Sequence, residues 1–272
     1  MALTWWAAHD VGVLRRVDAR VLEGFLGLQR PGLNAITEWV ASLCNPMPYV
    51  LLAAVPVAIA LARRRPRVAI ALAVLMIGAA ESAEHLKPLL AGPRDPVIGR
   101  YLGDGTWPSG HATAAMALAL AMVISVPSRL RPAVGAVMAA FTVAVVYSFL
   151  ELGWHYPSDV IGGFELASTW SLLVLGALWT YEAHRPGLRA DGSGAGARFS
   201  VGAILTPAVL VVLGALGLAA IVVAARPHEV LGYAAGHETA LVGAAAIGAL
   251  SLACAAGLGL VLRRPPGRRP QR

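Results

Sequence analysis

Long stretches that are almost free of charged residues constrain this chain more than any other feature. They lie at residues 47–62, 68–80, 112–127, 133–150, 160–181, 199–225 and 239–262. Most of them approach the roughly 20 residues that a helix needs to cross a bilayer. Because hydrocarbon offers no partner to backbone N–H and C=O groups, stretches of this length are expected to be helices. The sequence therefore predicts an all-α, polytopic transmembrane helical bundle.

Composition and charge support the membrane prediction. The chain is 57% hydrophobic and 14% charged, whereas soluble proteins carry about 25% charged residues. A net charge of +7 would also suit a nucleic-acid-binding protein, but the basic residues lie between the apolar stretches, in loops that stay in the cytoplasm. These clusters are Arg63–Arg67, Arg129–Arg131, Arg185–Arg198 and the arginines from Arg263 onward. We therefore expect no nucleic-acid partner, and a C-terminus on the cytoplasmic side of a cell membrane.

The apolar stretches divide the chain into segments. In residues 1–45, Trp5 and Trp6 lie near Arg15 and Arg16, which is typical of an amphipathic segment at the bilayer surface; a short or re-entrant first span stays open. A five-helix membrane core is expected to follow, with two further C-terminal helices. The predicted segments are 46–183 for the core, 184–199 for a cytoplasmic linker, 200–262 for a two-helix transmembrane appendix and 263–272 for a basic cytoplasmic tail.

The two cysteines do not indicate a special site. Cys44 and Cys254 are far apart and lie in or beside apolar stretches. A disulfide framework or a metal site would need a different pattern. We expect both to be small buried side chains.

Polar residues from separate segments are predicted to meet at the outer face. Lys87 ends the helix expected at about 68–87, and Arg94 follows it. Ser109, Gly110 and His111 open the helix expected at about 110–126. His155 ends the helix at about 133–154, and Asp159 opens the one at about 158–182. Each has an ordinary structural explanation taken alone: Lys87 as a snorkelling side chain, Ser109 as a helix cap and Asp159 as a dipole partner. Their convergence is what those explanations leave unexplained.

These residue types suit phosphoryl transfer. Cations and helix N-terminal amides bind the negative phosphate oxygens, and Lys87, Arg94 and the N–H groups around Ser109–His111 would supply both. Cleavage without a metal needs a nucleophile and a proton donor, which two histidines provide. His155 and Asp159 are four residues apart, a spacing compatible with a paired imidazole and carboxylate.

This pattern resembles the type-2 phosphatidic acid phosphatase superfamily, whose signature is Lys-x6-Arg-Pro, Pro-Ser-Gly-His and Ser-Arg-x5-His-x3-Asp. The chain has Lys87-x6-Arg94, Pro108-Ser109-Gly110-His111 and Ser148-x6-His155-x3-Asp159, within a resemblance covering roughly residues 45–180. The resemblance implies that His155 attacks phosphorus and forms a phosphohistidine, that Asp159 orients it, and that His111 protonates the leaving group. It further implies no metal and no cofactor, with the phosphate held by Lys87, Arg94, Ser109 and Gly110.

Two positions depart from the family pattern. Asp95 replaces the proline after Arg94, and Phe149 replaces the arginine of the third motif. Phenylalanine cannot make the bidentate contacts that a guanidinium makes with phosphate. Arg100 is one candidate to supply the missing charge; a less charged monoester substrate and a weak or inactive relative are the alternatives. Glu151, four residues before His155, is an auxiliary candidate that would share its helical face.

The sequence therefore predicts an integral-membrane lipid phosphate phosphatase acting at the non-cytoplasmic face. Its substrate would be a phosphomonoester or diphosphate lipid such as phosphatidate, phosphatidylglycerophosphate or a polyprenyl diphosphate. A lipid phosphotransferase using the same site, and a catalytically inactive binding or transport protein on the same scaffold, are the alternatives. The pattern names neither the lipid nor the oligomeric state.

Overall fold

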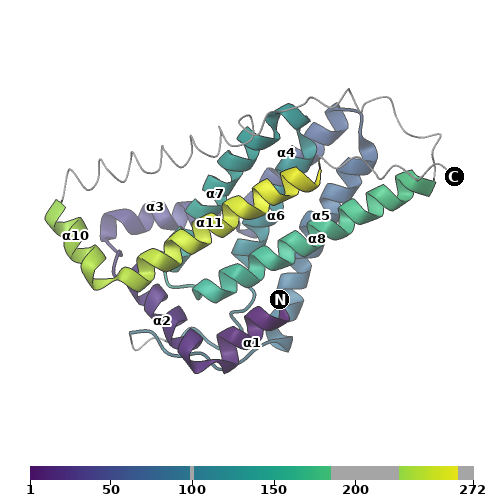
Figure 1. The fold of residues 1–272 in the computed structure, drawn as a ribbon. Coiled ribbons are helices and arrows are strands. Elements are labelled where there is room, and N and C mark those ends of the chain that lie inside the picture. The colour runs from purple at the N-terminus through teal and green to yellow at the C-terminus, as the bar shows by residue number, and fades with distance from the viewer. Residues whose placement is uncertain (99–100, 185–226, 263–272) are drawn as a thin grey trace.

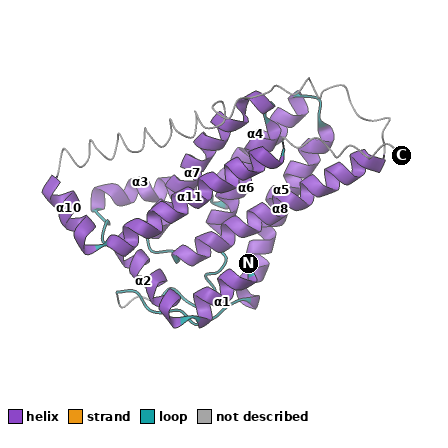
Figure 2. Cartoon of the chain, in the orientation of Figure 1, coloured by secondary structure: helices purple, strands orange, loops and turns teal. Residues whose placement is uncertain are grey.

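The computed structural model describes residues 1–98, 101–184 and 227–262, and within these ranges the chain is helical with no strand (Figures 1 and 2). The all-α prediction is confirmed for this part of the chain. The helices are α1 (Ala2–Asp10), α2 (Gly12–Leu26), α3 (Pro31–Ser42), α4 (Pro46–Ala62), α5 (Pro66–Leu89), α6 (Gly110–Ser125), the short 3₁₀ helix η1 (Ser128–Leu130), α7 (Arg131–Glu151), α8 (Pro157–His184), α10 (Pro227–Gly236) and α11 (Glu238–Val261).

Several of the described helices are long and apolar enough to cross a bilayer. They are α5, α7 together with η1, α8 and α11. Each has at least 24 residues, about 36 Å at the rise of an α-helix, which exceeds the thickness of the hydrocarbon core. The prediction of a multi-pass membrane protein is confirmed.

Helices α3 and α4 form a bent pair. They pass the same test together, as a broken span or a re-entrant loop, but are bent by 55° between Ser42 and Pro46. The break has a local cause, since a residue that precedes proline avoids the helical conformation and Asn45 is extended, with ψ of 153°. Residues 1–45, for which the sequence predicts a surface segment or a short first span, form α1, α2 and α3.

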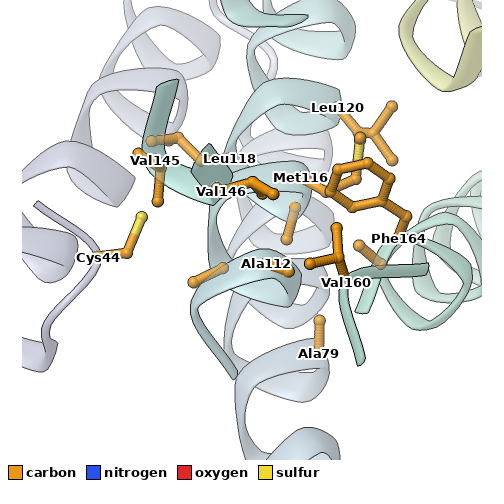
Figure 3. Close-up of a cluster of buried hydrophobic side chains, with 14 of the residues drawn as sticks. Cys44, Ala79, Ala112, Met116, Leu118, Leu120, Val145, Val146, Val160 and Phe164 are labelled. Carbon is orange, nitrogen blue, oxygen red and sulfur yellow. The ribbon is translucent and has the colours of Figure 1, made fainter. Parts of the chain in front are cut away.

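Helix α6 lies at the centre of the bundle (Figure 1) and packs against α4, α5, α7, α8 and α11. Almost all of its side chains are buried, and many are alanines, which allow membrane helices to approach closely. Figure 3 shows the resulting apolar cluster. Its labelled members include Ala112, Met116 and Leu120 from α6, Val145 and Val146 from α7, and Val160 and Phe164 from α8.

The two ends of the bundle differ in character. At one end α4 and α6 finish, and Arg63 donates a hydrogen bond to the carbonyl of Ser125; the Arg63–Arg67 and Arg129–Arg131 clusters belong to this end. At the other end α5 and α7 finish and α6 and α8 begin, as antiparallel connection requires. Helices α1 and α2 lie together at this second end (Figure 1), where both contact α8. The motif residues therefore gather at the end opposite the basic clusters.

Some predicted features fall outside the described residues. They are the linker beyond His184, the helix expected at about 200–225 and the tail at 263–272. The last predicted helix, at about 239–262, is α11.

Candidate active site

The Pro-Ser-Gly-His motif forms the start of α6. Ser109 caps the helix, and its Oγ accepts a hydrogen bond from the N–H of Ala112 at 3.3 Å. Its own N–H donates to the backbone carbonyl of Asp159 at 3.0 Å. The cap satisfies one of the free N–H groups at the helix N-terminus and links this motif to the start of α8.

A glycine in α8 permits this close approach. A β-carbon on Gly163 would lie 2.9 Å from both the Ser109 carbonyl oxygen and the Thr113 nitrogen. Both are backbone atoms that cannot rotate away. Only glycine therefore lets α8 pack against α6 so that Asp159 lies beside Ser109.

Lys87 lies beside the N-terminus of α6. Its Nζ is 2.7 Å from Glu84 Oε1 within the last turns of α5. A β-carbon on Gly110 would lie 2.8 Å from that oxygen and 3.5 Å from the lysine nitrogen. The absence of a side chain at Gly110 therefore brings this ion pair against the helix N-terminus, where an anion is favoured.

His155 and Asp159 form the predicted imidazole–carboxylate pair. His155 Nδ1 is 3.4 Å from Asp159 Oδ2, and the same oxygen accepts the N–H of Tyr156 at 2.9 Å. Asp159 is fully buried, whereas the His155 side chain is 12% exposed. The imidazole thus has its Nδ1 directed at a buried carboxylate, while part of the ring remains exposed.

The helical spacing assigned to Glu151 and His155 is wrong. Helix α7 ends at Glu151, and Gly153 has φ of +72°, a left-handed conformation that ends helices. His155 therefore lies in the loop before α8, where it does not share a helical face with Glu151. Glu151 is buried with no hydrogen-bond partner at either carboxylate oxygen.

Phe149 contacts both histidines. Its ring centroid is 6.0 Å from that of His111 and 5.4 Å from that of His155. His111 also contacts Trp154 at 5.5 Å. The residue that replaces the family arginine is thus a buried aromatic ring that packs against both imidazoles.

Asn45 is a contact that sequence reasoning missed. Its Oδ1 lies 2.9 Å from His111 Nε2, and it occupies the break between α3 and α4. An asparagine before a proline signals a helix boundary, but nothing in the sequence indicates which histidine it reaches.

Arg94 lies in a buried cluster of acids. Its side chain has no exposed surface, and its guanidinium donates to Asp159 Oδ1 and, at 3.3 Å, to Asp18 Oδ2. The guanidinium further contacts Ser158 Oγ at 3.0 Å and the Ala8 carbonyl at 3.3 Å, and lies 4.9 Å above the Tyr156 ring. In this arrangement it binds carboxylates, and a direct contact with phosphate would require it to leave them.

Asp18 is the second contact that sequence reasoning missed. It belongs to α2 and is buried beside the third motif. Burial raises the pKa of its carboxyl group to about 6, and the nearby charge of Arg94 acts in the opposite direction. Asp95, which departs from the family pattern, forms an ion pair at 2.9 Å with Arg15, which belongs to α2 as Asp18 does.

One sequence candidate and the question of a metal site remain. Arg100, the candidate to supply the missing charge, lies outside the described residues. Among the residues that the structure describes, no three His, Cys, Asp or Glu side chains are placed to hold a metal ion, and Cys44 and Cys254 are both free thiols.

Comparison with known proteins matches this segment of the chain to a family. Residues 80–185 match the PAP2 superfamily. A search of curated proteins found no match. Among solved structures, the chain is similar to a transmembrane PAP2-type phosphatidylglycerolphosphate phosphatase from Bacillus subtilis, at 20% identity and a TM-score of 0.54, over 66% of this chain and 92% of that one. The fold is thus shared, and all three motifs lie within residues 80–185, which match the PAP2 superfamily that the motifs resemble.

Proposed function

We propose that this protein is an integral-membrane lipid phosphatase that cleaves a phosphate ester through a phosphohistidine at His155. One observation carries the proposal: His155 Nδ1 faces the Asp159 carboxylate at 3.4 Å, and His111 and His155 both contact the ring of Phe149. A pure binding protein has no need of a nucleophile, its orienting carboxylate and a second imidazole around one position.

The first step would transfer the phosphoryl group to the enzyme. In this step Asp159 would accept the Nδ1–H of His155, which would leave the Nε2 lone pair free to attack. Nε2 forms a bond to phosphorus while the bond from phosphorus to the lipid oxygen breaks. His111 donates its proton to that oxygen, and the lipid leaves as an alcohol.

The second step would return the enzyme to its starting state. Neutral His111 takes a proton from a water molecule, whose oxygen attacks the phosphorus of phosphohistidine. The bond between nitrogen and phosphorus breaks, and inorganic phosphate leaves. His111 thereby serves as acid and then as base, as reversal of the same proton transfer requires.

The phosphate would be held by Lys87 and by the start of α6. The ammonium of Lys87 lies against Gly110, and the backbone N–H groups of the first turn supply directed donors. The Ser109 hydroxyl accepts from Ala112 and so keeps its own hydrogen to donate. With Phe149 in place of an arginine and Arg94 bound to carboxylates, this cradle has little positive charge, which favours a phosphomonoester lipid over a diphosphate.

The proposed site faces the non-cytoplasmic side. It occupies the end of the bundle opposite the Arg63–Arg67 and Arg129–Arg131 clusters, and basic loops stay in the cytoplasm. A lipid in the outer leaflet would then present its head group at the level of His155.

Phosphate release by the purified protein in detergent tests the proposal. We expect release from phosphatidate or phosphatidylglycerophosphate, with less from a polyprenyl diphosphate, and loss of activity in His155→Ala. His85→Ala is the matched control because His85 is exposed on α5, where its Nδ1 contacts the Glu81 carbonyl within the same helix. Label that appears on an added lipid acceptor would indicate a phosphotransferase, and a folded wild-type protein that releases no phosphate would contradict the proposal.

A further inference from the structure

A residue from outside the PAP2 segment enters the proposed site. Asp18 of α2 is 8% exposed, and its two carboxylate oxygens contact the start of α8. Oδ1 accepts the N–H of Ser158 at 2.8 Å, and Oδ2 accepts the Ser158 hydroxyl at 2.6 Å. Asp18 therefore binds the residue immediately before Asp159.

The same carboxylate also binds Arg94. Asp18 Oδ2 is 3.3 Å from Arg94 Nη1, while Arg94 Nη2 donates to Asp159 Oδ1. One guanidinium thus joins two carboxylates, with Asp18 on one side and Asp159 on the other. Since Asp159 Oδ2 faces His155, the contacts run from Asp18 through Arg94 and Asp159 to the imidazole.

Several contacts hold α1 and α2 in this place. The Trp5 indole donates to the Leu90 carbonyl at 2.8 Å, and Arg15 binds both Asp95 and the His9 carbonyl. Arg94 reaches the Ala8 carbonyl at the end of α1. Asp18 therefore belongs to an anchored part of the structure that supports the loop carrying Arg94.

The charges of this cluster leave a negative balance. Arg94 carries one positive charge, and Asp18 and Asp159 carry two negative charges within a fully buried group. A buried charge without a partner is costly. A His155 ring that carries a phosphoryl group on one nitrogen and a proton on the other is itself a cation, and the negative charge of that intermediate lies on the phosphoryl oxygens. The proposed intermediate would therefore place a positive ring next to Asp159.

We propose that Asp18 is a positioning residue for the reaction, which fixes the first turn of α8 and holds Arg94 so that Asp159 stays directed at His155. This inference rests on the proposed phosphatase function. Asp18 acts through Arg94, Ser158 and Asp159 and does not touch the substrate. Its loss therefore slows the chemical step and leaves lipid binding unchanged.

Asp18→Asn tests this role because it removes the charge and keeps the shape. We expect kcat for a short-chain phosphatidate in detergent to fall roughly 10- to 100-fold, with KM within about threefold of wild type. Formation of the acid-labile phosphoenzyme is expected to slow by the same factor. The matched control is Asp10→Asn, an exposed aspartate at the end of α1, which is expected to keep wild-type kcat.

Each outcome decides between the two proposals. Wild-type activity that is lost in His155→Ala, with wild-type kcat in Asp18→Asn, overturns the role of Asp18 and leaves the function standing. A folded wild-type protein without activity overturns both. If Asp18→Asn does not fold, the Ser158→Ala variant is the deciding test, because it removes the hydroxyl that contacts both Asp18 and Arg94 and keeps every charge. A fall in kcat of several-fold at unchanged KM would support the role of Asp18. An unchanged kcat would overturn it.

Discussion

The ring of Phe149 contacts both His111 and His155, with centroid distances of 6.0 and 5.4 Å. Phe149 is fully buried, so it packs against the proposed acid and the proposed nucleophile at once. Where the family pattern has a cation for phosphate, this chain has an apolar ring.

Phe149→Ala is expected to destabilise the fold and to reduce activity. The truncation removes a buried ring that contacts both imidazoles and leaves a cavity, and such losses cost about 3–5 kcal/mol. Thermal unfolding in detergent measures the effect. Trp154→Ala is the control, because Trp154 contacts His111 but is 40% exposed and is expected to lose less than half as much; similar losses in both variants would contradict a core role for Phe149.

The Lys87–Glu84 pair is expected to set substrate affinity. Lys87→Met removes a charge-assisted contact to phosphate, worth about 1.5–3 kcal/mol, and should raise KM at least tenfold. Glu84→Gln frees the ammonium from its 2.7 Å partner and should lower KM. Steady-state kinetics measure both changes, with Glu81→Gln on the exposed surface of the same helix expected to match wild type; equal KM values in all variants would remove Lys87 from the phosphate site.

Gly163→Ala is expected to separate α8 from α6. Its β-carbon would meet backbone atoms at 2.9 Å, and such overpacking costs about 1–3 kcal/mol. The displacement of Asp159 from Ser109 should also lower kcat. Gly176→Ala in the same helix is the control because nothing lies within 4 Å of its added carbon, and comparable unfolding temperatures for the two variants would contradict the close packing.

The stability contributed by Asp18 is expected to depend on pH. Its pKa is raised from 3.8 to about 6 by burial, which outweighs the facing Arg94 and Ser158, while Asp159 adds to the rise. Because the folded-state pKa exceeds the unfolded value, the stabilisation is complete below the unfolded pKa and is lost as pH rises through the folded pKa. When the pH is lowered from 8 to 5, the free energy of unfolding of wild type should therefore rise by about 1.4 kcal/mol relative to that of Asp18→Asn.

Thermal unfolding of the two proteins across that pH range measures this difference. The Asp10→Asn variant provides the baseline, since its residue is exposed. A constant difference between wild type and Asp18→Asn from pH 8 to pH 5 would show that Asp18 does not titrate in this window.

The helices could be predicted because their causes are local. Each apolar stretch must pair its own backbone groups, so the expected helices at about 110–126 and 158–182 match α6 and α8 within two residues. The motif spacings likewise placed His155 four residues before Asp159, and the structure brings them together. The sequence did not predict the bend at Asn45 or the end of α7 before Gly153. In both places a proline or a glycine ends the helix while the run of apolar residues continues past it.

Sequence alone determined the membrane fold, the match of residues 80–185 to the PAP2 superfamily and the residues at one end of the bundle, because hydrophobicity and motif spacing act along the chain. Only the tertiary structure decided that Arg94 binds Asp18 and Asp159. These contacts join residues 76 and 65 positions apart, and the bond from Ser158 to Asp18 spans 140 positions. Such pairs depend on how α1 and α2 pack against the membrane helices, and no local pattern in the sequence encodes which acid meets which guanidinium.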